Sequence, residues 1–526
     1  MTKPIKAARR CLSLLLSTVL LSALGCTDLT ETPTSAITPE NFYRNEAEVL
    51  GGLAAVYAQL RGVTGDYWDA TEVSSDEIVV PTRGQDWYDN GQWLELQRQT
   101  WTATSPSVGF MNGAWNVSFT GIARANVLLE ALQKVTVPNQ AAIVAELRTL
   151  RGFYYYQLID FFGGVPVVTT TEIKARPRAT RDSLFKFIES ELLDARTDLP
   201  DSWPAASNGR LTKGAADAIL ASMYLNAGVW MKQTGVSATS YNTCLGVQVS
   251  GGVDACQAAI TAADRIINSG RYSLAANWRS NFTADNQASP ENIMVVKFTN
   301  KPDVGLNFIM RALHYNQLTN ATPWNGFATE AQTYNAFDAN DQRRQMWLAG
   351  PQNNVETGAP VNDRSGNRLV FTTTINNVTA ATEGEGVRFY KYPADPSRPA
   401  GELNGNDYAI FRLAEIYLIK AEALNEQTAG SGAALTLVNA LRARVFNPPQ
   451  PRAAIDRAAL LQERLFELAA EAKRRQDLIR HGRFIDAWDY KAAGTPNLIL
   501  MPIPQSQMDA NPLLCQNPGY GGTACP

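Results

Sequence analysis

Apolar and aromatic residues recur at every third or fourth position along much of the chain, which places them on one face of an α-helix. This spacing is clear at residues 46–61 and again between 121 and 162, where Pro138 separates two helices. It returns further along the chain, at residues 181–199, 212–228, 254–269, 408–425, 433–445 and 453–480. The protein is therefore predicted to be mainly α-helical.

Three of these predicted helices resemble one another. Residues 146–163, 214–228 and 411–426 alternate small residues with Tyr and Leu, and a second helix usually follows each of them. Ala-rich helix pairs that pack closely are typical of tetratricopeptide-like units, although residues 229–252 interrupt any fixed period. The pattern predicts a scaffold of such pairs, and a generic bundle of helical hairpins is the alternative.

Long loops are predicted at residues 63–112 and 271–405. The second stretch is rich in Asn, Gly, Thr and Pro, and short alternating runs at residues 292–298 and 369–375 indicate strands or ordered loops. Regions of this type carry functional side chains more often than a helical scaffold does.

The N-terminus has the pattern of an export signal. Residues 1–10 contain four Lys or Arg and no acid, residues 11–24 are almost entirely apolar, and Gly25 precedes Cys26. A charged start before an apolar run of roughly 7–15 residues is a signal peptide, whereas a bilayer crossing needs about 20 apolar residues. We predict that residues 1–25 are a lipoprotein signal and that Cys26 is lipidated. Ala23 stands where lipoprotein signals usually have Leu, so an ordinary secretory signal cut nearby is the alternative.

Residues 27–41 are rich in Thr and Pro with few large apolar side chains, as expected of a solvated tether. The formal net charge is −3, and loss of the four cations of the signal takes it to −7. Nucleic-acid binding normally needs a basic patch, and no run of Lys or Arg supplies one. The sequence therefore argues against a nucleic-acid ligand.

Signatures of catalysis are missing from the sequence. The two histidines, His314 and His481, have no second His or Cys at the spacing of metal ligands. There is no GxSxG nucleophile elbow, no GxGxxG after a strand and no Walker-type phosphate loop. We predict no metal, no cofactor and no catalytic residue. Paired carboxylates of a glycoside hydrolase remain the alternative, because two acids about 5–9.5 Å apart suffice for that chemistry.

The sequence has six cysteines, of which Cys11 leaves with the signal and Cys26 takes the lipid. The other four fall into two local pairs, and an exported protein meets an oxidising compartment. We expect disulfide bonds from Cys244 to Cys256 and from Cys515 to Cys525.

Five blocks of the sequence resemble the SusD/RagB lipoproteins of bacterial nutrient-uptake systems. They are the Cys26 lipobox with its tether, RTLRGFYYYQLIDFFGGVPVVT at 148–169, NDYAIFRLAEIYLIKAEALNE at 406–426, ERLFELAAEAKRRQDLIRHGRF at 463–484, and LMPIPQSQMDANPLLCQNPGY at 500–520. Their order and spacing extend over nearly the whole chain. The fourth block departs from the family pattern at Ala470, where a bulky residue is usual, and at Ala472 and Lys473, where Gly and His are frequent.

The resemblance implies one SusD-like domain at residues 42–526. Its tetratricopeptide-like helical scaffold would occupy about 42–62, 113–270 and 406–485, and long loops at about 63–112 and 271–405 would build the ligand face. The resemblance also implies a non-catalytic, lipid-anchored protein on the outer membrane, facing the cell surface as a lid over a TonB-dependent barrel transporter of the SusC type. The ligands of the family are most often oligosaccharides, and some members look like peptide binders. A purely structural lid is a further alternative.

Residues 65–101 contain five large aromatic side chains among Asp, Asn, Gln and Arg, namely Trp68, Trp87, Tyr88, Trp93 and Trp101. Sugar rings present apolar C–H faces and polar rims, so a binding site needs flat aromatic surfaces beside planar polar groups. The candidate ligand residues are Arg83, Trp87, Asn90 and Trp93, together with Tyr315 and Trp324, whose positions resemble those that complete an aromatic arc in the family. The alternative is that each Trp is a core anchor, because Trp is highly buried on average.

Cys26→Ala is expected to move the protein from the membrane to the soluble fraction, because the mature chain then lacks its acyl anchor. Cell fractionation and immunoblotting measure this shift. Mass spectrometry of the wild type should find an acylated Cys26 at the N-terminus, and an unmodified N-terminus elsewhere would refute the prediction.

Overall fold

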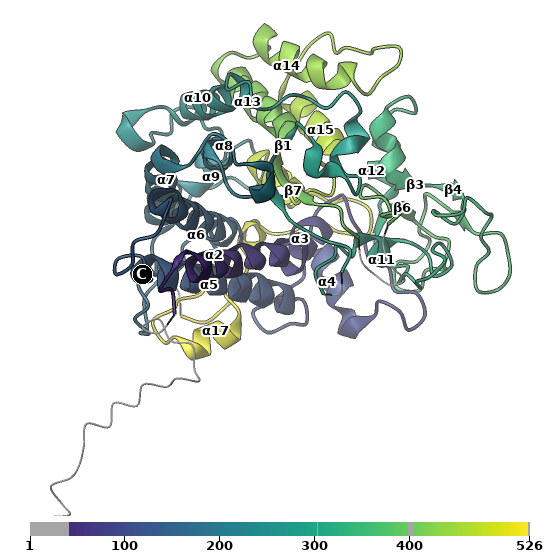
Figure 1. The fold of residues 1–526 in the computed structure, drawn as a ribbon. Coiled ribbons are helices and arrows are strands. Elements are labelled where there is room, and N and C mark those ends of the chain that lie inside the picture. Colours follow the sequence, from purple (N-terminus) through teal and green to yellow (C-terminus); the bar gives the residue numbers. More distant parts are fainter. Residues whose placement is uncertain (1–41, 302, 398–403, 524–526) are drawn as a thin grey trace, which may run out of the picture.

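The computed structural model describes residues 42–301, 303–397 and 404–523, which form a mainly helical body (Figure 1). Its longer helices are α2 (Glu46–Ala58), α5 (Val108–Ala131), α6 (Gln140–Phe162), α7 (Arg181–Asp198), α8 (Lys213–Leu225), α10 (Ala255–Ile267), α13 (Leu413–Gln427), α14 (Gly432–Ala443) and α15 (Arg457–Leu468). Shorter helices are α3 (Asp66–Val73), α4 (Gln92–Arg98), α9 (Ala227–Trp230), α11 (Phe308–Ala312), α12 (Ala331–Ala336), α16 (Arg474–Arg480) and α17 (Gln505–Ala510). The prediction of a mainly helical protein is confirmed.

The longer helices pack in a chain of neighbours. Contacts run from α5 to α6 and on through α7, α8, α10 and α13 to α14, and these helices fill the left and upper parts of Figure 1. Such stacking of each helix on the one before agrees with the predicted scaffold of helix pairs. The predicted signal, the tether and Cys26 lie outside the described residues.

Local chemistry sets where these helices begin and how closely they approach. The side chains of Thr180, Asp254 and Asp456 accept hydrogen bonds from backbone N–H groups in the first turns of α7, α10 and α15. In α5, a Cβ added to Gly121 would lie 2.4 Å from the ring of Tyr154 in α6. The glycine therefore lets this aromatic ring of α6 lie directly against the backbone of α5.

Residues 408–425, predicted as one helix, are a strand followed by a helix. The strand β7 (Tyr408–Arg412) pairs antiparallel with β1 (Asn292–Val296), and α13 begins only at Leu413. The prediction was wrong for residues 408–412 because their aromatic and branched side chains also fit a helix face. The partner strand that satisfies their backbone groups lies more than a hundred residues earlier in the chain.

The predicted helix at residues 453–480 is interrupted at 469–473. Between α15 and α16, Ala470 and Ala472 adopt positive φ values of 61° and 56°. The N–H of Ala470 donates to Glu77 Oε2 at 2.9 Å, and the N–H of Ala472 donates to Glu72 Oε1 at 2.6 Å. Two buried carboxyl groups from distant sequence thus hold a turn that the helical spacing does not reveal.

The predicted loops also contain regular structure. Residues 63–112 include α3, α4 and the start of α5, so this stretch is more helical than expected. In residues 271–405 the strands β2 (Ala328–Thr329), β6 (Val387–Phe389) and β3 (Trp347–Leu348) form one small sheet, and β4 (Gly350–Pro351) pairs with β5 (Val370–Phe371). These short strands lie at the right of Figure 1, beside the helical body.

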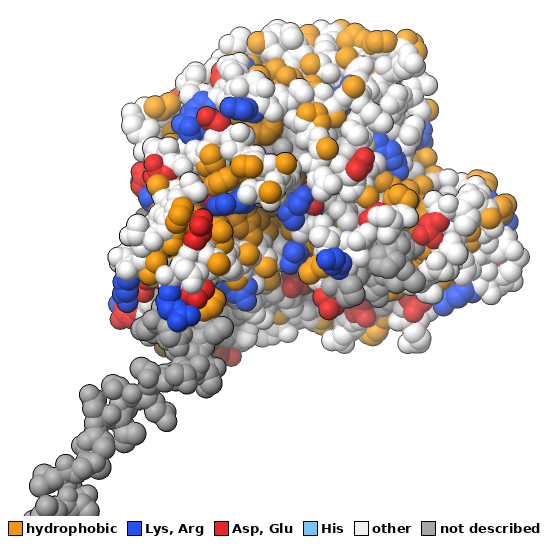
Figure 2. Space-filling view, in the orientation of Figure 1, with side chains coloured by type: hydrophobic (Ala, Val, Ile, Leu, Met, Phe, Trp, Pro, Cys, Tyr) orange, Lys and Arg blue, Asp and Glu red, His pale blue; other side chains and the backbone are white. Residues whose placement is uncertain are grey.

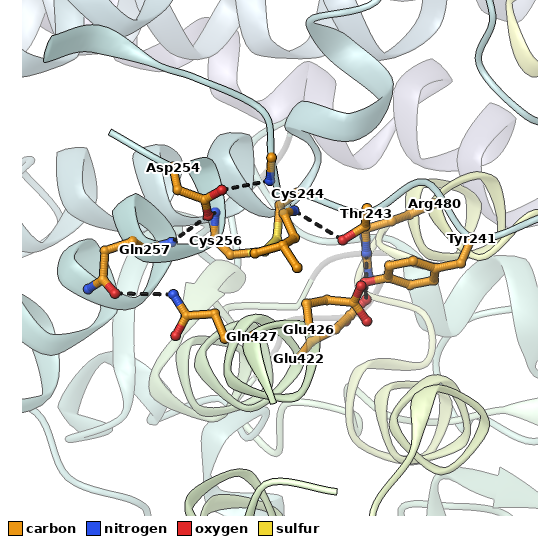
Figure 3. The surroundings of a disulfide bond; sticks show 12 residues. Tyr241, Thr243, Cys244, Asp254, Cys256, Gln257, Glu422, Glu426, Gln427 and Arg480 are labelled. Carbon is orange, nitrogen blue, oxygen red and sulfur yellow. Dashed lines mark hydrogen bonds and ion pairs between the residues drawn. A yellow bond between two sulfur atoms is a disulfide. The ribbon is translucent and has the colours of Figure 1, made fainter. Parts of the chain in front are cut away.

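Cys244 and Cys256 form a disulfide bond with their Cα atoms 5.0 Å apart, which is the first of the two expected pairs (Figure 3). Asp254 caps the helix that carries Cys256 and also accepts a hydrogen bond from the N–H of Gly246 at 2.6 Å. The second expected pair involves Cys525, which lies outside the described residues. Within the described ranges, no helix combines the length and the apolarity that crossing a bilayer requires.

Ala472→Gly is expected to raise the free energy of unfolding by up to about 1 kcal/mol, because an L-residue in the left-handed region is strained by roughly 1–2 kcal/mol and glycine is not. The matched control is Ala55→Gly, at an exposed position inside α2, which should lower it by about 1 kcal/mol. Urea denaturation measures both changes. Equal destabilisation by the two glycines would contradict the prediction.

Candidate ligand-binding site

Three of the predicted aromatic residues meet at one pocket. Trp87, Tyr315 and Trp324 line a surface pocket of about 440 Å³, together with Gln85, Asp86, Asp89, Thr322 and Pro323. All three rings are partly exposed, so each combines a fixed position with an accessible surface. The fold thus brings two loops, more than two hundred residues apart in sequence, into one candidate site.

Trp87 is held firmly although it lies on a loop. Its Nε1 donates to the carbonyl of Trp324 at 2.6 Å, and its backbone φ of 63° lies in the left-handed region. A Cβ added to Gly326 would lie 2.3 Å from the indole ring of Trp87, so only glycine allows the ring to rest there. The rings of Trp87 and Trp324 have centroids 6.4 Å apart and are tilted by 49°.

Tyr315 is positioned by charged neighbours. Its hydroxyl donates to Asp86, and the guanidinium of Arg364 lies 4.0 Å from the centre of its ring. Burial and the hydrogen bond to Asp86 raise the pKa of Tyr315 to about 12, so the hydroxyl stays protonated at neutral pH. A protonated hydroxyl both donates and accepts hydrogen bonds.

Arg364 is fixed in turn by Glu383. The Nε2 of His314 lies 2.9 Å from Glu383 Oε2, and Arg364 bonds the same carboxylate through its backbone and side chain. Burial raises the pKa of Glu383, but the hydrogen bonds from Arg364 and His314 outweigh it and lower the pKa to about 2. Glu383 therefore remains ionised over the physiological range and keeps Arg364 in place.

Arg83, predicted as a ligand residue, is instead part of the framework behind the pocket. Its side chain is 3% exposed, its Nε donates to the carbonyl of Asn325 at 2.9 Å, and its Nη2 donates to the carbonyl of Glu385 at 2.9 Å. Burial lowers its pKa to about 10, which leaves the group charged at neutral pH. The structure corrects the prediction here: Arg83 is buried, uses three of its donors to join two loops and does not line the pocket.

The structure also corrects the prediction for Trp93, which lies in the core and not at the ligand surface. It is 6% exposed, its ring packs 4.7 Å from Phe110 and 5.3 Å from Phe327, and its Nε1 donates to Asp89 Oδ2 at 2.7 Å. The core-anchor alternative therefore holds for Trp93. Asn90 is exposed beside Asp89, with a φ of 57°, but it does not line the pocket.

The polar residues of the pocket were not singled out from the sequence. Gln85, Asp86 and Asp89 lie in the predicted aromatic segment, and Thr322 and Pro323 directly precede Trp324. Their closeness in sequence to two candidate indoles is the one signal that indicated them. Among the residues that the structure describes, no group of three or more His, Cys, Asp or Glu side chains is placed to hold a metal ion. The arrangement suits reversible binding of a polar ring.

Comparison with known proteins gives the family of the chain. The model of the SusD family matches residues 257–520, and a second model, described as starch-binding associating with outer membrane, matches residues 45–225. The SusD-like protein P25 of Formosa agariphila is 24% identical, and the match covers 95% of this chain and 98% of that protein. The starch-binding protein SusD of Bacteroides thetaiotaomicron is also 24% identical, with coverage of 90% and 89%.

Solved structures show the same fold. A laminarin-binding SusD-like protein superposes with a TM-score of 0.71 at 24% identity, over 91% of this chain and 100% of that one. Surface glycan-binding protein A from Bacteroides thetaiotaomicron, in complex with laminarihexaose, superposes with a TM-score of 0.70 at 21% identity, over 90% and 99%. The helical scaffold with its loop-rich insertions is therefore shared with these proteins.

Trp93→Ala is expected to lower the free energy of unfolding by about 3–5 kcal/mol, because it empties a core position. The control is Tyr88→Ala, whose side chain is 57% exposed and whose loss should change stability by less than about 0.5 kcal/mol. Chemical denaturation followed by fluorescence compares the two variants. A small effect of both would show that Trp93 does not anchor the core.

Proposed function

The chain belongs to the SusD family, and we propose that it binds oligosaccharides at the pocket of Trp87, Tyr315 and Trp324 without reacting with them. We further propose that it does so as a lipoprotein anchored through Cys26 in the outer membrane, facing the cell surface, and that it delivers the ligand to a TonB-dependent barrel transporter. The observation that carries the binding role is the meeting of three partly exposed aromatic rings at one polar pocket.

The aromatic walls suit the apolar faces of sugars. The two indoles are tilted by 49° to one another and Tyr315 lines the same pocket, so the aromatic walls are not one flat stack. A chain of sugar rings also bends, and each ring presents C–H groups to a flat neighbour. Because Trp87 and Tyr315 are already held by hydrogen bonds, ligand binding costs little side-chain entropy.

The polar groups suit the hydroxyls that rim a sugar ring. Asp86 and Asp89 offer carboxylate oxygens, Gln85 offers an amide and Thr322 a hydroxyl. Asp86 and Asp89 also accept hydrogen bonds from Tyr315 and Trp93, which fixes their orientation. Few but well-placed polar groups around an apolar surface are typical of small-ligand sites.

The names of the relatives support the same class of ligand and a binding role. One curated relative is named a starch-binding protein, and two solved neighbours are a laminarin-binding protein and a surface glycan-binding protein. The description of the second matching family model associates it with the outer membrane. The export signal and Gly25-Cys26 support the lipid anchor, and the family resemblance supports the transporter partner.

Trp87→Ala and Trp324→Ala are each expected to weaken oligosaccharide binding at least about tenfold, or ~1.4 kcal/mol, because each removes a wall of the pocket. Affinity electrophoresis and titration calorimetry with laminarin, starch and other glycans measure the loss. Tyr88→Ala is the matched control, since this exposed ring lies beside Trp87 but outside the pocket lining. Unchanged binding in both Trp variants would remove this pocket as the site.

Prolonged incubation of the protein with the same glycans distinguishes binding from hydrolysis. Product analysis of the wild type should find the glycans intact after prolonged incubation. Slow release of short sugars that Asp86→Asn abolishes would instead identify a surface glycoside hydrolase. Binding of peptides but of no glycan would identify a peptide-binding member of the family.

A further inference from the structure

The eleven tryptophans of the chain divide sharply by exposure. Seven are buried, at 6% exposure or less: Trp68, Trp93, Trp101, Trp115, Trp230, Trp278 and Trp347. Four are partly exposed, namely Trp87, Trp203, Trp324 and Trp488, and each of these lines a surface pocket. Because Trp is buried on average, an indole kept at the surface is informative. Of the two that lie outside the aromatic pocket, Trp203 is the one whose surroundings more closely resemble a binding site.

Trp203 lines a groove of about 320 Å³ that shares no residue with the aromatic pocket. A second hollow of about 260 Å³ continues it and has Asn208, Gly209, Arg210 and Val295 in common with it. The two hollows lie between α2, β1 and the loop of residues 201–212 that precedes α8. Figure 2 shows apolar and Lys or Arg side chains on the face where Figure 1 places α2, α8 and β1. Ligand pockets in proteins begin at about 300 Å³, so the groove is large enough for a small ring.

One wall of the groove is a flat, rigid stack. The guanidinium of Arg210 lies 3.7 Å from the centre of the Trp203 ring, and Trp203 Nε1 donates to the carbonyl of Leu211 at 2.8 Å. Arg210 Nε in turn donates to Glu146 Oε2 at 3.1 Å, and the side chain of Glu146 is fully buried. Both members of the stack are thus tied to the helical scaffold.

Tyr57 strengthens this support from α2. Its hydroxyl donates to Glu146 Oε2 at 2.5 Å and accepts the N–H of Leu211 at 2.8 Å. The segment that carries Arg210 and Leu211 is therefore fixed from two sides before any ligand arrives. Pre-organisation of this kind lowers the entropy that binding costs.

The rest of the groove combines an apolar floor with a polar rim. Ile293 and Val295 of β1 line it as apolar residues, and four exposed polar side chains surround them: Ser202, Asn208, Arg271 and Gln287. Two arginines, Arg210 and Arg271, are balanced by two aspartates, Asp201 and Asp407, in the same lining. The balance of charge suits an uncharged ligand that carries many hydroxyl groups.

We propose that this groove is a second carbohydrate-binding site, which takes a neutral pyranose ring against the Trp203–Arg210 stack. The proposal rests on the proposed function, because it assumes that the protein meets glycans. The C–H face of the ring lies on the flat wall, and its hydroxyls bond the amides and Arg271 at the rim. Two separate sites on one molecule let a polysaccharide be held at two points, which raises its overall affinity above that of either site.

The test compares Trp203→Ala, Trp324→Ala and the double variant in affinity gels that contain laminarin or starch. Each single variant is expected to bind the polysaccharide at least about tenfold more weakly than the wild type, and the double variant should not be retarded. Titration with the hexasaccharide of the retarding polymer should give two sites for the wild type and one for each single variant.

Trp488→Ala is the matched control, because Trp488 is also a partly exposed indole in a surface pocket and should leave retardation unchanged. Arg271→Ala and Asn208→Ala test the rim without touching the indole and should weaken binding even if Trp203→Ala does not fold. Wild-type retardation that Trp203→Ala and both rim variants leave unchanged, with one site by titration, overturns the second site alone. A wild type that no glycan retards overturns the proposed function, and the second site with it.

Discussion

The fold depends on one buried carboxylate, Glu467 in α15, and the arginines that surround it. Its two oxygens contact Arg412 of β7 at 2.7 Å, Arg444 after α14 at 2.5 Å and Arg343 of η7 (Gln342–Met346) at 2.9 Å. Burial raises the pKa of Glu467, but these three cations outweigh it and hold the pKa below its usual range. Removing one partner of a buried ion pair lowers the free energy of unfolding by roughly 3–5 kcal/mol. These ion pairs therefore hold three separate parts of the chain against α15.

The segment that follows α15 also positions the side of the molecule that carries the aromatic pocket. Directly after α15, Ala470 and Ala472 bond the carboxyl groups of Glu77 and Glu72, which fixes α3 and the loop that follows it. Asp69 of α3 then pairs with Arg311 of α11 at 2.7 Å. The carbonyl of Arg311 accepts the N–H of Gly326 at 2.8 Å, directly under the ring of Trp87. A continuous set of polar contacts thus runs from the helical core to the aromatic pocket.

Partly exposed and buried tryptophans have different roles in this architecture. Trp93 is buried in the core next to Trp87, whereas Trp87 and Trp324 are partly exposed and line the pocket. The loops that carry Trp87 and Trp324 are joined through buried guanidinium groups. Arg83 donates hydrogen bonds to the carbonyls of Asn325 and Glu385, and Arg388 donates one to the side chain of Asn325. Cations inside the protein therefore give loops the rigidity that a binding surface needs.

The sequence by itself determined most of the longer helices, because the spacing of apolar residues is a local property, whereas α3 and α4 lie in a stretch predicted as loop. It also indicated the aromatic segment, since a cluster of indoles among polar residues stands out in any loop. It did not determine that residues 408–412 form a strand or that residues 469–473 break a helix, because β1, Glu72 and Glu77 lie far away in sequence. Only the tertiary structure decided which indole faces solvent. Trp87 and Trp93 are six residues apart and look alike in sequence. Trp87 packs on Gly326 at the edge of the core and stays partly exposed, whereas Trp93 lies against Phe110 and is buried.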